Sequence, residues 1–140
     1  MMRDTIIEPG TLRLDGNKLS VSIRMPWYRA LPLSSVCNLA LDIDGAAVAT
    51  ESIHWLINGT NFAQTELPPL HDQWWFVTDS AVLSGDLSDE AVAALNLDAE
   101  HDVHVVLGIY IPYIDAGHGT LLVTESDRKT LKIEKSAANV

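Results

Sequence analysis

The chain has a single cysteine, Cys37, among its 140 residues. One cysteine cannot form an internal disulfide bond, and Cys37 lies in a run of alternating apolar residues, where a buried structural thiol is the usual interpretation. A chain of this length buries enough apolar surface to fold without disulfides or a structural metal. We therefore predict one domain that spans residues 1–140.

Basic residues are absent from the whole middle of the chain, between Arg29 and Arg128, and the formal net charge is −10. Nucleic acids and acidic membranes are bound through clustered lysines and arginines, so both are excluded as partners. If the two chain ends meet, the cations form one patch that suits an acidic partner: Arg24, Arg29, Arg128 and Lys129. The alternative is that these charges are scattered and solvated.

The sequence also lacks an apolar run long enough to span a membrane. Its first residues, MMRDTIIEPG, carry acidic side chains and a Pro-Gly turn where a signal peptide needs an apolar segment. We expect a soluble, cytoplasmic protein.

Motifs that carry chemistry are missing as well: there is no glycine-rich phosphate loop, no nucleophile elbow and no clear pair of catalytic carboxylates. Five histidines are present. However, His101 and His104 lie three residues apart on a predicted strand, so they face opposite sides of the sheet and cannot bind one metal ion together. We expect no catalytic residue, cofactor or metal site in this chain.

A small constellation around residue 73 is the best candidate for ligand contact. The carboxylate of Asp72 can orient the ring of His71 beside Trp74 and Trp75, and aromatic faces of this kind bind sugar rings or flavonoid-like aglycones. With Tyr113, the residues His71, Trp74 and Trp75 are our candidate substrate-lining residues. The alternative is a polar loop that leads into an aromatic-rich strand.

Apolar residues alternate with polar ones through most of the chain, which is typical of half-buried β-strands. The predicted strands cover residues 19–25, 37–43, 46–48, 53–57, 74–77, 81–83 and 103–111. Asp44-Gly45 and Asn58-Gly59 are typical of hairpin turns. The other face of strand 103–111 is also partly apolar, which predicts a central strand covered on both sides and ended by Pro112.

One segment, Ser88 to Leu97, has a helical pattern instead. Ser88 suits the N-cap, Asp89 and Glu90 suit the positive end of a helix, and the alanines that follow favour a helix. Many short strands, one short helix and no β-α-β rhythm predict an all-β fold, an antiparallel β-sandwich of jelly-roll or immunoglobulin-like topology.

The segment from Ile23 to Leu33, IRMPWYRALPL, predicts a displayed surface. Two prolines fix the backbone and remove hydrogen-bond donors, so the chain between them cannot continue a strand ladder. Arginine and aromatic residues dominate binding hot spots. Our candidate partner-binding residues are Arg24, Pro26, Trp27, Tyr28, Arg29 and Pro32. The alternative is a strand end whose tryptophan folds back onto its own core.

Six segments taken in order resemble the small β-subunit of bacterial C-glycoside deglycosidases. They are IRMPWYRALPL (23–33), DIDG (42–45), INGTNF (57–62), DQWWF (72–76), IYIPYI (109–114) and ESDRKTLKI (125–133). The first and the last are the most specific, because Asx-Gly turns occur in any hairpin protein.

The resemblance implies a lyase made of two components, in which this chain is the accessory subunit. The partner would be a TIM-barrel α-subunit, similar to sugar-phosphate isomerases and epimerases, that holds a divalent metal, manganese in our expectation, and the catalytic base. The substrate would be a 3-oxo-C-glycoside, and its carbon–carbon bond would be cleaved by elimination. Alone, this chain would be inactive.

Two other classes of function compete with this one. A stand-alone carbohydrate- or aromatic-ligand-binding β-sandwich would use Trp27, Trp55, Trp74 and Trp75 as stacking platforms. A self-contained enzyme of the cupin type is disfavoured because the sequence has no His-x-His arrangement.

Overall fold

The structure is a computed structural model, and it describes residues 6–25, 30–57, 59–67, 69–70, 73–76, 80–96, 98–115, 117 and 120–134. The strands are β1 (Arg13–Asp15), β2 (Lys18–Arg24), β3 (Leu31–Pro32), β4 (Val36–Ile43), β5 (Ala46–Ala47), β6 (His54–Ile57), β7 (Thr60–Ala63), β8 (Trp74–Trp75), β9 (Ser80–Asp86), β10 (Glu100–Asp115) and β11 (Thr120–Lys132). Within these described ranges there is one α-helix, α1 (Asp89–Ala94), between β9 and β10, and short 3₁₀ turns cover Leu33–Ser35, Thr50–Ser52 and Gln64–Glu66.

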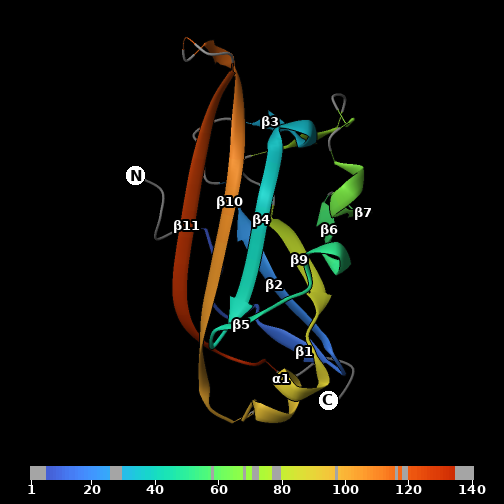
Figure 1. Cartoon of the computed structure of the whole chain (residues 1–140), viewed down its shortest axis with the longest axis vertical. Coiled ribbons are helices and arrows are strands. Elements are labelled where there is room, and N and C mark those ends of the chain that lie inside the picture. Colours follow the sequence, from blue (N-terminus) through green and yellow to red (C-terminus); the bar gives the residue numbers. More distant parts are fainter. Residues whose placement is uncertain are drawn as a thin grey trace.

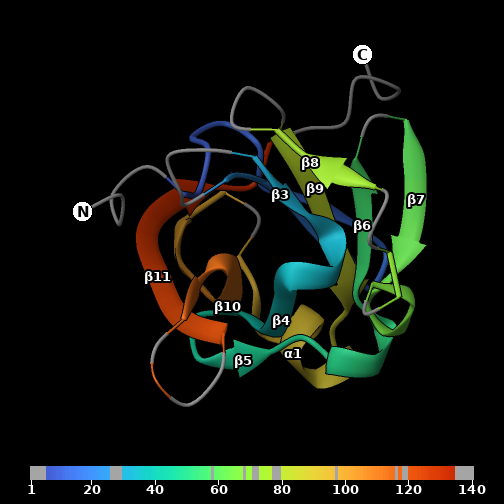
Figure 2. The same ribbon diagram turned by 90° about the horizontal axis from the view of Figure 1, so that it is seen from above.

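The strands form two main antiparallel sheets, with the order β1-β2-β9-β6-β7 in one and β11-β10-β4-β5 in the other. The sheets face each other around a common interior, with β11 and β7 at far sides of the molecule (Figure 1, Figure 2). A two-stranded ribbon of β3 and β8 crosses one end. The predicted antiparallel β-sandwich with one short helix is confirmed, while the choice between jelly-roll and immunoglobulin-like topology stays a prediction.

The core is made by the alternating residues that the sequence indicated. In β2 the residues Leu19, Val21 and Ile23 are fully buried, and the inward residues of β10, from Val103 to Ile111, are too. Each Å² of apolar surface that is removed from water contributes about 25 cal/mol to stability, and this is the dominant stabilising contribution in such a fold. One cluster of buried apolar side chains connects both sheets.

The turn between β4 and β5 forms as predicted. Asp44 and Gly45 both have positive φ, 51° and 82°, which is the backbone of a two-residue hairpin turn that matches the twist of the strands. The helix is also confirmed, although it is shorter than predicted, and the hydroxyl of Ser88 accepts a hydrogen bond from the amide of Ala91 at 3.1 Å. Such a cap satisfies one of the free amide groups at a helix start.

Three features of the long hairpin differ from the prediction. Pro112 does not end β10, which continues to Asp115 with a register shift after Ile111; proline is tolerated where the ladder is already irregular. The outer face of β10 is covered only in part: Gly108 is buried and His104 and Val106 are half-buried, but Tyr110 is 41% exposed. The strand β11, which is second in length only to β10, was not among the predicted strands.

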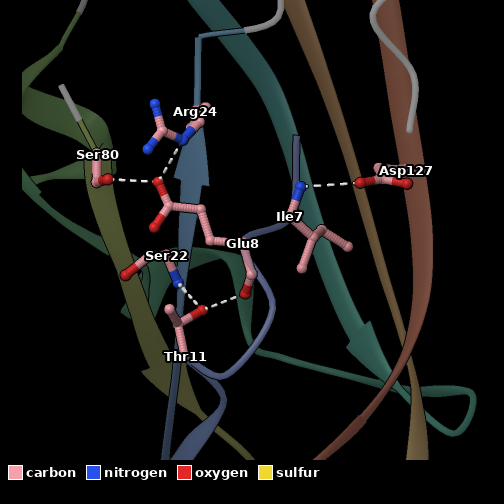
Figure 3. Close-up of polar contacts among 7 residues, drawn as sticks. All are labelled: Ile7, Glu8, Thr11, Ser22, Arg24, Ser80 and Asp127. Atoms are coloured by element: carbon pink, nitrogen blue, oxygen red, sulfur yellow. Dashed lines mark hydrogen bonds and ion pairs between the residues drawn. The ribbon is translucent and has the colours of Figure 1, made fainter. Parts of the chain in front are cut away.

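The N-terminal segment closes one side of the sandwich. Ile7 pairs with Ile23 of β2 in an antiparallel bridge, and the Ile6 carbonyl accepts a hydrogen bond from the Arg24 amide at 2.8 Å. The amide of Ile7 points the other way and donates to Asp127 of β11 at 2.8 Å (Figure 3). Residues 6–8 therefore connect β2 of one sheet to β11 of the other.

In the described part of the chain, no helix is long and apolar enough to cross a membrane.

Candidate functional site

The predicted partner-binding residues lie where β2 ends and β3 begins, but Pro26, Trp27, Tyr28 and Arg29 are outside the described residues. Arg24, the last residue of β2, pairs with Glu8 through its Nε at 2.9 Å, while its side chain stays 53% exposed. The Ser80 hydroxyl donates to the same carboxylate oxygen (Figure 3). Arg24 is therefore held by its own chain and still presents surface.

The β3–β8 ribbon joins the two groups of sequence candidates. Pro32, predicted to bind a partner, lies opposite Trp74, predicted to line a substrate site. Trp74 is 44% exposed, and Phe76, two residues further along, is 49% exposed. Trp74 at the end of the ribbon and Phe76 just after it therefore both expose aromatic surface. Phe76 was not among the predicted site residues.

Trp75 belongs to the core instead of a substrate-lining surface. It is fully buried and packs edge-on against Trp55, with ring centroids 5.5 Å apart and an interplanar angle of 76°. Such edge-to-face pairs contribute about 0.5–1.5 kcal/mol beyond the area that they bury. Because Trp55 is equally buried, neither ring offers a stacking face to a ligand at the surface of this chain.

The last two candidate residues cannot be placed. His71 lies outside the described residues, and for Tyr113 the structure describes the backbone within β10 but not the side chain.

The histidines of β10 face opposite sides of the sheet, as predicted: His101 is buried and His104 is half-exposed. His101 is fully engaged, because Nδ1 lies 2.5 Å from a carboxylate oxygen of Asp44 and Nε2 lies 2.8 Å from the Asn96 carbonyl. The described residues contain no group of three or more histidine, cysteine or carboxylate side chains placed to hold a metal ion.

The contact between Asp44 and His101 makes a pH dependence testable. Burial raises the pKa of the Asp44 carboxyl, but the hydrogen bonds from His101 and the Asp102 amide and the charge of His101 outweigh it and lower the pKa overall. A carboxyl group whose pKa is lower in the folded state than in the unfolded state, where it is about 3.9, stabilises the fold at pH values above the unfolded-state pKa. This contribution disappears as the pH falls through the folded-state pKa.

We therefore expect the difference in unfolding free energy between wild type and Asp44→Asn to shrink as the pH falls from about 5 to about 3. Asparagine tolerates the positive φ of this position, so the turn itself is kept. Urea unfolding at a series of pH values measures the difference. Asp98→Asn, at an exposed position outside these contacts, is the control, and a difference independent of pH for Asp44→Asn would contradict this assignment.

The single cationic patch suggested by the sequence does not form from the described residues. Arg128 and Lys129 are neighbours in β11, so their side chains leave opposite faces of the strand. Arg128 pairs with Asp102 at 2.7 Å on the outer face, and Lys129 pairs with the buried carboxylate of Asp127 at 2.8 Å on the inner face. Each charge is used within the chain, and Arg29 lies outside the described residues.

Cys37 is half-buried, and burial raises the pKa of its thiol. A raised pKa lowers the fraction of reactive thiolate at neutral pH. This agrees with a structural thiol.

Exposed apolar side chains are the surface feature that the sequence did not reveal. Tyr110 of β10 and Leu122 of β11 lie directly opposite each other on the outer face of the hairpin, and each is 41% exposed. The signal was present in the run Leu121-Leu122-Val123, because three successive apolar residues in a strand place at least one on each face.

The described residues form an antiparallel β-sandwich that exposes apolar side chains on two strand pairs. Comparison with known proteins gives the family. The family model of the C-glycoside deglycosidase beta subunit matches residues 15–113.

The relatives agree with that match. The chain is 50% identical over 133 residues to the C-glycoside deglycosidase beta subunit of Microbacterium trichothecenolyticum, which covers 94% of this chain and 97% of that protein. It is 44% identical to a C-glycoside deglycosidase beta subunit of Arthrobacter globiformis, over 95% of this chain and 98% of that protein. It is 32% identical to the 3'-dehydrocarminate deglycosidase beta subunit of a Microbacterium species, over 99% of this chain and 100% of that protein. The chain belongs to the C-glycoside deglycosidase beta-subunit family, as its motifs indicated.

Proposed function

We propose that this chain is the accessory subunit of a heteromeric C-glycoside deglycosidase that cleaves the carbon–carbon bond of 3-oxo-C-glycosides by β-elimination. The observation that carries the proposal is family membership across nearly the whole chain, together with relatives that are named as subunits. The surface supports it, because exposed side chains such as Trp74, Phe76, Tyr110 and Leu122 are of the kind that a protein partner covers.

The chemistry explains why such an enzyme needs an oxidised sugar. A carbon–carbon glycosidic bond has no basic oxygen for an acid to protonate, so hydrolysis by paired carboxylates has little to act on. A ketone at C3 makes the neighbouring C2–H acidic. A base removes that proton, the electron pair forms a C1–C2 double bond, and the aglycone carbon leaves C1 and takes up a proton.

We assign the base and the divalent metal, manganese in our proposal, to a TIM-barrel α-subunit similar to sugar-phosphate isomerases and epimerases. There the cation would stabilise the enolate. The described residues of this chain do not fit a metal of their own, because no group of ligands converges and His101 is already engaged on both ring nitrogens.

The role proposed for this chain is to bind and stabilise the barrel. The segment around Arg24 and Pro32 is one proposed contact, and Trp74 is a proposed wall on the aglycone side of the site. A stand-alone ligand-binding sandwich is less well supported, because Trp55 and Trp75, two of its four proposed stacking platforms, are fully buried.

Metal analysis of the purified complex tests this division of roles. We expect a tagged form of this chain to co-purify with an epimerase-like TIM barrel, such as one encoded by an adjacent gene. After the subunits are separated, stoichiometric manganese should stay with the barrel. Elemental analysis of each polypeptide decides the matter. Stoichiometric manganese or zinc on this chain would contradict the proposal, and failure to bind any such barrel would remove it.

A further inference from the structure

The ring of His101, at the start of β10, lies between two hydrogen-bond acceptors. Its Nδ1 is 2.5 Å from a carboxylate oxygen of Asp44 in the β4–β5 turn, and its Nε2 is 2.8 Å from the backbone carbonyl of Asn96. A carbonyl oxygen and an ionised carboxylate only accept hydrogen bonds, whereas a neutral imidazole carries a hydrogen on one nitrogen. Both contacts are therefore satisfied together only when His101 carries two ring protons and a positive charge.

The carboxyl group of Asp44 is held in its charged form, which only accepts. Burial raises its pKa, but the hydrogen bonds from His101 and from the Asp102 amide, together with the charge of His101, lower the pKa overall. The Asp102 amide donates to the second carboxylate oxygen at 2.8 Å, so both oxygens of Asp44 have a donor. An ionised carboxylate beside a ring nitrogen favours the imidazolium form of the ring.

Other charged side chains on the elements around His101 are exposed or paired with one another. The residue directly opposite His101 on β11 is Leu131, which is apolar and buried. Asp89 and Glu90 of α1, Asp98 after it, Glu100 of β10 and Lys132 of β11 are exposed. The neighbouring strands also carry the pairs of Asp42 with His104, Asp102 with Arg128, and Asp127 with Lys129. Among the described residues, Asp44 is therefore the charged group in contact with the ring.

The ring joins three segments of the chain at one end of the sandwich. Asp44 belongs to the β4–β5 turn, Asn96 to the segment between α1 and β10, and His101 to β10 itself; α1 and the start of β10 lie together at this end in Figure 1. The Asn96 carbonyl also accepts a hydrogen bond from the Ala99 amide at 3.0 Å, and a carbonyl oxygen has lone pairs for two donors. The segment after α1 is thus held to the β4–β5 turn through the His101 ring.

We propose that His101 is a pH-sensitive switch: its doubly protonated ring holds the segment after α1 against the β4–β5 turn, and loss of one ring proton releases that segment. The neutral ring has one N–H. The contact with the charged Asp44 is the stronger of the two, so the nitrogen that faces Asn96 is the one left without a proton. Two acceptors then face each other across 2.8 Å, and the Asn96 carbonyl moves away.

The switch responds to a pH range in which the carboxylates stay ionised, because histidine is the side chain whose charge ordinarily changes between about pH 5 and pH 8. The inference concerns contacts within the chain and does not depend on the proposed function.

Nuclear magnetic resonance of the full chain, labelled with nitrogen-15, tests the charge state, because ring nitrogen shifts distinguish protonated from unprotonated nitrogens. We expect both ring nitrogens of His101 to be protonated at about pH 6 and one of them to lose its proton as the pH rises. Asp44→Asn removes the anionic acceptor and should move the midpoint of this titration to lower pH by about one unit or more. His104, on the other face of β10 and 3.6 Å from Asp42, is the internal control, and its midpoint should move much less.

Amide hydrogen exchange of the same samples measures release of the segment. Once His101 has lost a proton, the Ala99 amide should exchange at least about tenfold faster relative to the Ser52 amide. Ser52 is the matched reference, because its amide also donates at 3.0 Å to the carbonyl three residues earlier, and the ratio of the two rates removes the general acceleration of exchange with pH. In His101→Gln this ratio should not depend on pH. If that variant does not fold, Asp44→Asn carries the same test, and its ratio should change at lower pH than in the wild type.

Four results would overturn the inference. A single ring proton on His101 at about pH 6 would mean that the ring is neutral and that one of its two contacts is not a hydrogen bond. A ring that keeps both protons until the chain unfolds would be a permanent structural cation. Loss of a proton without a change in the exchange ratio would mean that the segment after α1 is held by other contacts. An unchanged His101 midpoint in Asp44→Asn would mean that Asp44 does not hold the ring proton.

Discussion

Purified without its larger subunit, this chain should show no turnover of a 3-oxo-C-glycoside, and adding the larger subunit should restore cleavage. The reason is chemical: β-elimination needs a base placed at the C2–H and a group that stabilises the enolate, and the described residues offer no converging set of ligands. His101, the buried histidine of β10, already has an acceptor at each ring nitrogen. The rate at which free aglycone is released, monitored by chromatography, measures the turnover.

The control for that experiment is the larger subunit alone, assayed at the same concentration with added manganese. Its activity should be well below that of the mixture, since we assign this chain a stabilising role. A monodisperse preparation of this chain that cleaves the 3-oxo-C-glycoside by itself would contradict the assignment of the catalytic groups to the partner.

Local patterns in the sequence predicted most of the strands and turns of the sandwich, because the conformational preferences and the apolar alternation of neighbouring residues determine them. Asp44-Gly45 favours a two-residue turn wherever it occurs between alternating strands, and both residues have the positive φ that this turn needs. The alternation of Leu19, Val21 and Ile23 similarly identified the buried face of β2. Such features do not depend on distant parts of the chain.

The strand β11 escaped prediction because its buried face is not apolar throughout. Its inward residues include Glu125, Asp127 and Lys129 between Val123 and Leu131. A search for alternating apolar residues does not find a strand of this kind. What makes it a strand is pairing along nearly all of β10, and the charged inward residues are tolerated because Ile7, far away in the sequence, supplies a donor to Asp127.

The candidate site was predicted less well than the fold, because contacts between residues far apart in the sequence decide which of its side chains are exposed. The motif Trp74-Trp75 must send one ring to each face of its strand, but only the packing of Trp75 against Trp55 decides which ring is buried. Likewise, alternation separates the two faces of β10 without showing whether the face with Tyr110 is covered. Exposure depends on what packs against an element, and this information is not local.

Asp127→Ala should destabilise the chain by about 3 kcal/mol, because it removes a buried carboxylate that accepts hydrogen bonds from a backbone amide and from an ammonium group. The Asp127 side chain is 3% exposed, and its removal leaves the Lys129 ammonium group and the buried amide of Ile7 without this acceptor. The link between the N-terminal segment and β11 is lost with it. Urea unfolding of the purified chain measures the change in unfolding free energy.

Asp102→Ala provides the matched control, since it also removes one carboxylate that is paired with a cation of β11. The pair between Asp102 and Arg128 is exposed, with side chains 41% and 59% accessible, and an exposed pair contributes less than about 1 kcal/mol. Both variants change the net charge equally, so the general repulsion within an acidic chain cancels between them. A loss as small for Asp127→Ala as for Asp102→Ala would mean that residues 6–8 are held to β11 by apolar packing, and that the carboxylate is not what closes this side of the sandwich.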